Sequence, residues 1–233
     1  MVQPYKRQMI HDILPYTCAA TLEAFVTHPL EITRIRYVNR TTLWRGIRGL
    51  YPGFGIQLLG MIPSRTAFIG TKDYAVTKGL RWWEYSPLSA ALQTLVEGPF
   101  QSWKTARAEQ IPIRARPSGI TPMYARNLIF ACGLFGVSEG RLVCNKRHPI
   151  VTTAIGVSIG VIASHPFDVV RIAKQSIHRD LSYHQIICNL YETGRHKGHG
   201  KTLWRGCAGR LVVTCVGITT MIESMRFFKL RLG

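Results

Sequence analysis

A short pattern occurs three times along the chain: a proline, then an acid or amide two residues later, then a base three residues after that. The copies are Pro29, Glu31 and Arg34; Pro99, Gln101 and Lys104; and Pro166, Asp168 and Arg171. Their prolines are 70 and 67 residues apart in a chain of 233 residues. Such a long, regular period indicates tandem copies of one structural unit, because repeated units bury their apolar faces against their neighbours.

Each copy is followed by a second, longer match. The matching segments are RGLYPGFGIQLLGMIPSRTAFIGTKDY, RPSGITPMYARNLIFACGLFGVSEG and LWRGCAGRLVVTCVGITTMIESMR. A unit with an apolar helix, the proline pattern and a second helix gives six helices in all. The sequence therefore predicts one domain over residues 1–233, with repeats at approximately 8–80, 84–146 and 148–232.

Uncharged stretches of 10 to 19 residues recur along the chain, at 13–22, 49–64, 85–96, 127–138, 149–167 and 211–222. Only the fifth approaches the roughly 20 apolar residues that a helix surrounded by lipid needs, so a soluble all-α protein with buried helices is a real alternative. Basic residues cluster between the stretches, however, and the chain carries a net charge of +18 with 46% hydrophobic residues. Apolar spans with basic connectors favour a membrane protein whose helices face lipid on one side and water on the other.

These motifs resemble those of the mitochondrial carrier family, the solute carriers of the inner membrane. The family signature is Pro-x-Asp/Glu-x-x-Lys/Arg at the end of each odd-numbered helix, followed by an aromatic-base-glycine block before each even-numbered helix. Gly53 and Gly206 end good matches to that block, Gly119 is what the second repeat retains, and Gln101 replaces the second signature acid. The resemblance implies an all-α membrane protein with six transmembrane helices in three tandem two-helix repeats, arranged as a pseudo-threefold bundle.

The three loops differ in length. The signature proline and the block glycine are 24, 20 and 40 positions apart in the first, second and third repeats. The loop helices of the family fit the third value, so the first two loop helices are predicted to be shortened or absent. His28 and His165 directly precede signature prolines, where we expect hydrogen-bonded histidines at helix kinks.

The resemblance assigns the signature residues to a gate on the matrix side of the membrane. A proline inside a helix removes a backbone hydrogen bond, so kinks are expected at Pro29, Pro99 and Pro166. The expected pairs around the ring are Glu31 with Lys104, Gln101 with Arg171, and Asp168 with Arg34. Buried ion pairs add little net stability after desolvation, so such a ring can close a path and still open.

A second, cytoplasmic gate is expected from the aromatic-acid-x-x-base motif of the family's even-numbered helices. The corresponding acids are Asp73, Glu139 and Glu223, and only Glu223 is followed three residues later by a base, Arg226. The resemblance therefore implies a weak cytoplasmic gate that opens easily.

Substrate contacts in the family fall seven residues after the block glycine. This count gives Gly60 in the first repeat, Arg126 followed by Asn127 in the second, and Val213 in the third. Counting back from the third gate acid gives Arg210 instead, so both positions are candidates. An arginine inside a membrane is costly unless it faces water or an anion. The Arg-Asn pair resembles carriers of carboxylates more than carriers of nucleotides.

The resemblance implies transport of an anionic metabolite, preferably a carboxylate or keto acid and next a nucleotide, across the mitochondrial inner membrane by alternating access. The alternative is a carrier homologue without transport activity that acts as a structural or regulatory subunit of a membrane complex. Besides the metabolite, an anionic lipid such as cardiolipin is the expected partner of this multi-pass protein. A monomer is expected unless the chain joins a larger complex, and binding of nucleic acid is the least favoured explanation of its charge.

No pattern in the sequence supports an enzyme, a cofactor or a metal site. The segment GRHKGHGKT at 194–202 resembles a phosphate-binding loop, but its first glycine is one residue too far from the second. The spacing of Cys188, His196 and His199 is too loose to indicate a metal site. The six cysteines include no CxxC pair, which predicts free, buried thiols in a reducing compartment.

Overall fold

The computed structural model describes residues 3–43, 46–113, 118–139, 149–176, 178–196 and 202–232. Over these residues the protein has seven α-helices and no strand, which confirms the predicted all-α class. The helices are α1 (Gln3–Asn39), α2 (Phe54–Thr77), α3 (Trp82–Glu109), α4 (Ile120–Glu139), α5 (Pro149–Gln175), α6 (Tyr183–His196) and α7 (Cys207–Leu232). All except α6, which has 14 residues, contain at least 20 residues.

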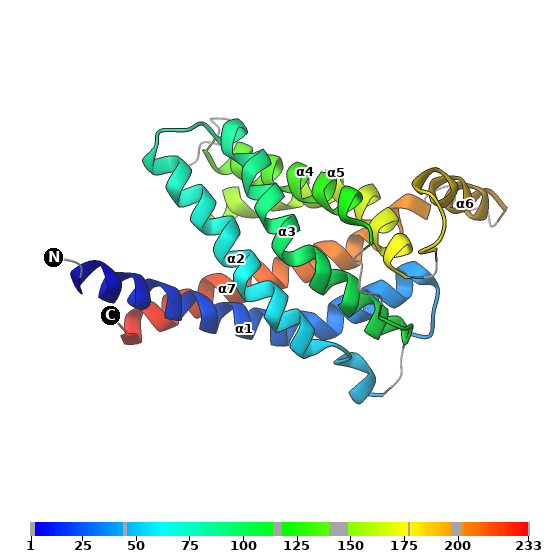
Figure 1. Cartoon of the computed structure of the whole chain (residues 1–233), viewed down its shortest axis with the longest axis horizontal. Coiled ribbons are helices and arrows are strands. Elements are labelled where there is room, and N and C mark those ends of the chain that lie inside the picture. Colours follow the sequence, from blue (N-terminus) through cyan, green and yellow to red (C-terminus); the bar gives the residue numbers. More distant parts are fainter. Residues whose placement is uncertain are drawn as a thin grey trace.

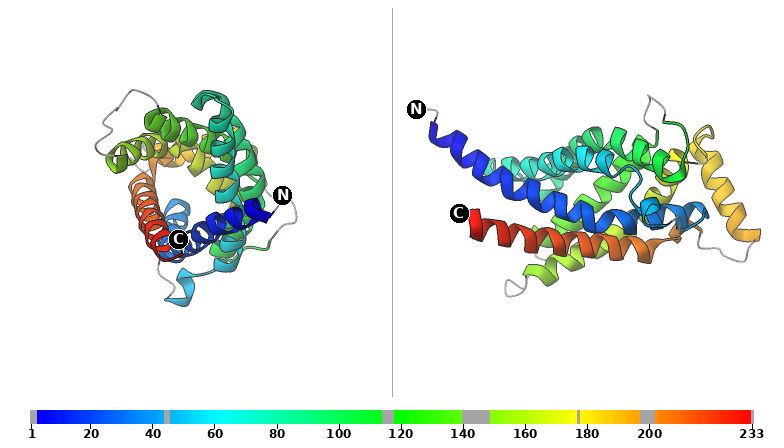
Figure 2. Two further views of the ribbon diagram at one scale, coloured as in Figure 1. Left: turned by 90° about the vertical axis from the view of Figure 1, so that its left-hand side faces the viewer. Right: turned by 90° about the horizontal axis from the view of Figure 1, so that it is seen from below.

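The six long helices form a ring when the molecule is seen along its length (Figure 2). Each second helix of a predicted repeat packs most extensively on the first helix of the next repeat, as α2 does on α3 and α4 on α5. The contact of α7 with α1 closes the ring. Both termini lie at one end of the molecule, and α6 lies at the other (Figure 1). The end that carries α6 is also the end at which α1, α3 and α5 finish and their connectors begin (Figure 1).

A glycine with positive φ precedes each of α2, α4 and α7. Gly53, Gly119 and Gly206 have φ values of 73°, 74° and 80°, a conformation that costs little only without a side chain. Each glycine also lies against the signature base of the following repeat: Gly53 against Lys104, Gly119 against Arg171, and Gly206 against Arg34. The three block glycines therefore share one conformation and one packing relation.

The connectors differ as their spacing predicts. The third contains α6 and the 3-10 turn η3 (Thr202–Trp204). The described residues of the first connector form only the turn η1 (Arg48–Leu50), and those of the second contain no helix. The long spacing in the third repeat therefore corresponds to an additional helix.

Two of the described helices are long and apolar enough to cross a membrane, through the segments Ile120–Val137 of α4 and Ala154–Gln175 of α5. By hydropathy of the uncharged stretches alone, only 149–167 is long enough. The α4 segment qualifies as well because the helix begins before the uncharged stretch at 127–138 does. Core helices of soluble proteins can have the same length and composition, so this finding supports membrane association only weakly.

The cysteines are free but are not buried. Cys18, Cys132, Cys188 and Cys207 are partly exposed, and Cys215 is exposed. The prediction of buried thiols was wrong for these five residues, while Cys144 lies outside the described residues. The outer faces of the long helices are rich in apolar side chains, so a small apolar residue such as cysteine is placed there as readily as inside.

Candidate functional site

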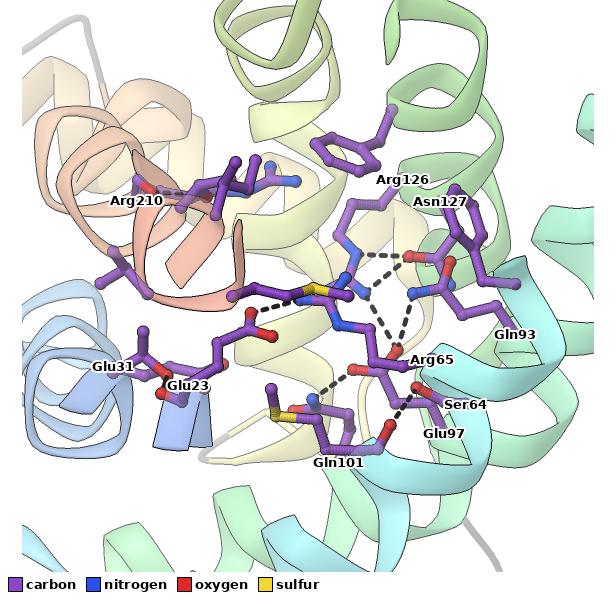
Figure 3. A pocket seen from close by; sticks show the side chains of 18 of the residues that line it. Glu23, Glu31, Ser64, Arg65, Gln93, Glu97, Gln101, Arg126, Asn127 and Arg210 are labelled. Carbon is purple, nitrogen blue, oxygen red and sulfur yellow. Dashed lines mark hydrogen bonds and ion pairs between the residues drawn. The ribbon is translucent and has the colours of Figure 1, made fainter. Parts of the chain in front are cut away.

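A cavity of about 340 Å³ lies inside the ring, between α1, α2, α3, α4 and α7. Its charged and amide side chains point toward one another across the centre (Figure 3). They include Glu23, Glu31, Arg34, Arg65, Gln93, Glu97, Gln101, Arg126, Asn127 and Arg210. Apolar side chains of α2, α4 and α7 complete the wall at Phe68, Phe130, Leu134, Ile218 and Met221.

Arg126 and Asn127 of α4, the predicted substrate contacts of the second repeat, both line this cavity. The guanidinium of Arg126 donates to Asn127 Oδ1 from Nε at 3.0 Å and from Nη2 at 2.6 Å. Its Nη1 lies 3.3 Å from Asp168 Oδ1 of α5, and its Nη2 lies 3.9 Å from Glu97 Oε2 of α3. Asn127 is fixed in turn by donating from Nδ2 to Thr94 Oγ1 at 2.9 Å. The cavity thus contains an oriented guanidinium, 13% exposed, beside two carboxylates.

Both candidates for the third contact also line the cavity. Arg210 and Val213 lie three residues apart on α7, so they share one face of the helix. Arg210 donates from Nη2 to Ser164 Oγ at 2.9 Å, and its Nε lies 3.9 Å from Asp168 Oδ2. The two alternative counting rules therefore both identify cavity residues, and Arg210 is the charged one.

Gly60 is not among the cavity residues. A Cβ atom added to Gly60 would lie 2.5 Å from Phe100 Cβ, so this glycine allows α2 to approach α3 closely. The inward face of α2 carries Gln57, Met61, Ser64, Arg65 and Phe68, at helical spacing. Gly60, the position counted from Gly53, lies beside that face and not on it. The structure therefore does not place Gly60 at the cavity, where a substrate contact was predicted.

Two of the three expected signature pairs are present on one side of the cavity. Lys104 Nζ lies 2.8 Å from Glu31 Oε2, and Arg34 Nη2 lies 2.7 Å from Asp168 Oδ2. These contacts join α1 to α3 and α1 to α5, respectively. They bring together residues that the repeat pattern places 73 and 134 positions apart in the chain.

The third expected pair, between Gln101 and Arg171, is not formed. Gln101 donates from Nε2 to Glu97 Oε1, and its own Oε1 is buried without a hydrogen-bond partner. Arg171 instead contacts Asp168 Oδ1, from Nη2 at 2.9 Å and from Nε at 3.0 Å. A charged carboxylate one helical turn away is a stronger acceptor for a guanidinium than a neutral amide.

Asp168 is consequently shared by several arginines. It is fully buried, and its carboxylate lies within 4 Å of Arg34, Arg171, Arg126 and Arg210. Those four residues come from α1, α5, α4 and α7. One carboxylate therefore connects the signature residues to the arginines of the cavity, which the pairwise scheme expected from the sequence did not include.

Each signature proline lies inside the first helix of its repeat, and the histidines that precede two of these prolines are hydrogen bonded. Pro29, Pro99 and Pro166 lie within α1, α3 and α5. His28 Nε2 lies 3.2 Å from the Pro52 carbonyl oxygen, and His165 Nε2 lies 3.1 Å from that of Arg205. Each carbonyl belongs to the residue before a block glycine, so the histidines brace equivalent points of two repeats, as expected.

The residues of the predicted cytoplasmic gate lie toward the ends of the long helices that are nearer the termini. Glu223 is exposed on α7. The side chains of Asp73, Glu139 and Arg226 lie outside the described residues, so the pairing of Glu223 with Arg226 stays a prediction. His199 of the rejected metal pattern also lies outside them, and no group of three or more potential metal ligands occurs in the described part of the chain.

Three charged cavity residues were not predicted. Arg65 of α2 pairs with Glu23 of α1 at 2.6 Å, and Glu97 of α3 accepts a hydrogen bond from Gln93 Nε2 at 3.2 Å. A simple signal identifies them, because Glu23, Arg65 and Glu97 are each the first charged residue after an uncharged stretch. Asp168 follows a stretch in the same way, and Arg126 and Arg210 immediately precede the other two.

The charged side chains of the cavity and of the network beside it are predominantly basic. Among the described residues, six are bases: Arg34, Arg65, Lys104, Arg126, Arg171 and Arg210. Four are acids: Glu23, Glu31, Glu97 and Asp168. An interior with two surplus positive charges attracts anions and excludes cations.

No protein-family model matches the chain, and no curated protein matches it in sequence.

Proposed function

We propose that the protein is a carrier of the mitochondrial type, which moves an anionic metabolite of the carboxylate or keto-acid class across the mitochondrial inner membrane. The observation that carries this proposal is the guanidinium of Arg126, which is held by Asn127 inside a central cavity with surplus positive charge. Guanidinium groups bind carboxylates through two parallel hydrogen bonds, so Arg126 is suited to hold one end of the metabolite.

The distribution of polarity supports a multi-pass membrane protein. Charged residues such as Arg34, Lys104 and Asp168 are buried inside the ring. Large apolar side chains are exposed on every long helix, including Phe25, Leu59, Leu95, Ile120, Ile159 and Val212. This arrangement is the reverse of that in soluble proteins, where apolar residues fill the interior. It suits helices that face lipid outside and water inside, including those whose charges lower their mean hydropathy.

The repeated geometry supports three two-helix repeats in a carrier-like bundle. The block glycines occupy equivalent positions, each in the left-handed region and each against the signature base of the next repeat. The histidine contacts recur in the first and third repeats. In transporters built from tandem repeats the substrate site lies at the interface between the repeats, and this cavity is lined by helices of all three predicted repeats.

The two ion pairs beside the cavity suit an alternating-access mechanism. Glu31–Lys104 and Arg34–Asp168 hold α1, α3 and α5 together at the end that carries α6. Access from this end requires both pairs to separate, whereas the gate that the resemblance implies at the opposite end is a weak one. Binding of an anion inside the cavity supplies interaction energy that offsets the separation of the pairs.

The test is uptake by proteoliposomes that contain the purified full chain. A panel of labelled dicarboxylates, tricarboxylates, keto acids and nucleotides separates the substrate classes. We expect saturable, protein-dependent uptake of a carboxylate and none of a nucleotide. Uptake restricted to nucleotides would contradict the carboxylate assignment, and absence of uptake across the panel would contradict transport itself.

The second candidate is a carrier homologue without transport activity in a larger membrane complex. It is favoured by the internal partners of Arg126 and Arg210, since Asn127, Ser164 and Asp168 already occupy donors of their guanidinium groups. A site held shut by such contacts would not exchange ligands. Recovery of the chain in a defined complex, together with inactive proteoliposomes, would favour this candidate.

A further inference from the structure

Gln101 departs from the repeat in a way that changes the charge of the cavity. The equivalent residues of the other repeats, Glu31 and Asp168, are acids that pair with bases. Gln101 lines the cavity from α3 but carries no charge, and its buried Oε1 has no hydrogen-bond partner. Buried polar oxygens normally accept a hydrogen bond, so this position is not explained by packing alone.

The missing carboxylate leaves one acid to serve several arginines. Arg171, the base expected opposite Gln101, contacts Asp168 on its own helix, and Arg34 and Arg126 use the same carboxylate. Among the described residues, the cavity and the ion-pair network beside it together contain six bases and four acids, a surplus of two positive charges. Burying uncompensated charge is unfavourable, so this surplus needs a counter-ion.

We infer that the cavity selects a metabolite with two negative charges, of the dicarboxylate class, and that Gln101 sets this charge preference. The inference rests on the proposed transport of anions. A dicarboxylate neutralises the surplus, whereas a monocarboxylate leaves one positive charge buried. One carboxylate of the ligand would take the place of Asp168 beside Arg126. The other would meet Arg65, whose guanidinium also points into the cavity and which is 31% exposed (Figure 3).

The test compares butanedioate with butanoate, which differ only in the second carboxylate. Binding of each to the full chain in detergent is measured by titration calorimetry. We expect the wild-type protein to bind butanedioate roughly tenfold or more tightly than butanoate, as one additional buried charge interaction predicts. Gln101→Glu gives Arg171 its missing acid, reduces the surplus to one charge and should lower the preference for butanedioate roughly tenfold.

Two further variants separate charge from packing. Gln101→Met has a side chain of similar length without charge, and the preference for butanedioate should stay within about twofold of wild type. Glu97→Gln removes an acid that lines the cavity, raises the surplus to three charges and should increase the preference. This second variant tests the charge rule in the opposite direction, even where Gln101→Glu fails to fold.

The outcomes distinguish the inference from the proposed function. Equal binding of butanedioate and butanoate by the wild-type protein would overturn the inference while leaving anion transport intact. A loss of preference in Gln101→Met as large as that in Gln101→Glu would overturn the role of charge at this position. Failure of both ligands and of the wider carboxylate panel to bind would contradict the proposed function itself.

Discussion

Arg34 of α1 and Asp168 of α5 form a buried ion pair in which Nη2 and Oδ2 lie 2.7 Å apart. The two residues belong to the first and third copies of the proline pattern, so the pair joins the first repeat directly to the last. Asp168 also contacts Arg126 at 3.3 Å. The carboxylate that holds one end of the ring together therefore lies within reach of the ligand that Arg126 would bind.

Asp168→Asn should destabilise the protein and abolish uptake. The change leaves several buried guanidinium groups without their shared carboxylate, and removal of one partner of a buried pair costs about 3–5 kcal/mol. Thermal unfolding in detergent measures the stability, and proteoliposomes measure the uptake. Glu192→Gln is the control, because Glu192 is an exposed acid on α6. An unfolding temperature equal to that of the control would contradict the central position of Asp168.

Glu31→Gln should also lower stability, by about 3–5 kcal/mol, because it leaves the ammonium group of Lys104 buried without a counter-ion. The double variant Glu31→Gln with Lys104→Met removes both charges and should recover at least half of that loss. Chemical or thermal unfolding of the wild type, both single variants and the double variant forms a double-mutant cycle. Strictly additive losses in the double variant would show that the two residues do not interact.

Gly53→Ala should be more harmful than Gly55→Ala, although the two glycines are only two residues apart in the chain. Gly53 has a φ of 73°, and an alanine in this region costs about 1–2 kcal/mol. Gly55 lies within α2 with nothing within 4 Å of its added Cβ, so alanine there should be neutral or stabilise by up to about 1 kcal/mol. The unfolding temperatures of the two variants provide the comparison, and equal losses would count against the left-handed turn before α2.

The orientation in the membrane is tested by thiol labelling of Cys188 on α6. A variant that keeps only this cysteine should react with a membrane-impermeant maleimide after the inner membrane is permeabilised, because α6 lies opposite the termini (Figure 1). Lys78→Cys in a cysteine-free background should react from the other side, since Lys78 is exposed in the connector between α2 and α3. Labelling of Cys188 in mitochondria with an intact inner membrane would contradict the proposed orientation.

Much of the helical fold could be predicted from the sequence, because its signals are local and repeated. The spacing between Pro166 and Gly206 predicted the additional helix in the third connector. The shorter spacings predicted shortened or absent helices in the first two connectors, whose described residues contain no α-helix. Hydropathy alone was a poorer guide. Charges such as Glu23 and Arg65 interrupt the apolar stretches, yet they face inward and pair across the cavity.

The candidate site was predicted less completely, because rotation about a helix axis and the choice of ion-pair partner are three-dimensional properties. Counting from Gly53 led to Gly60, which packs on Phe100 instead of facing the cavity. The predicted ring of separate pairs included an amide–cation pair between Gln101 and Arg171. The neutral amide of Gln101 cannot hold a guanidinium against a nearby carboxylate, so Arg171 contacts Asp168, and this outcome depends on distances that spacing does not give.

The most direct measurement of the central claim is carboxylate uptake by proteoliposomes that contain Arg126→Ala. Because Arg126 is the guanidinium oriented into the cavity by Asn127, its loss should eliminate uptake while membrane insertion is unchanged. Arg126→Lys should retain a fraction of uptake with weaker apparent affinity, since an ammonium group cannot form the bidentate pair. Arg107→Ala, at an exposed arginine of α3, should transport normally. Uptake by Arg126→Ala at the wild-type rate would contradict the proposal that this cavity carries carboxylates.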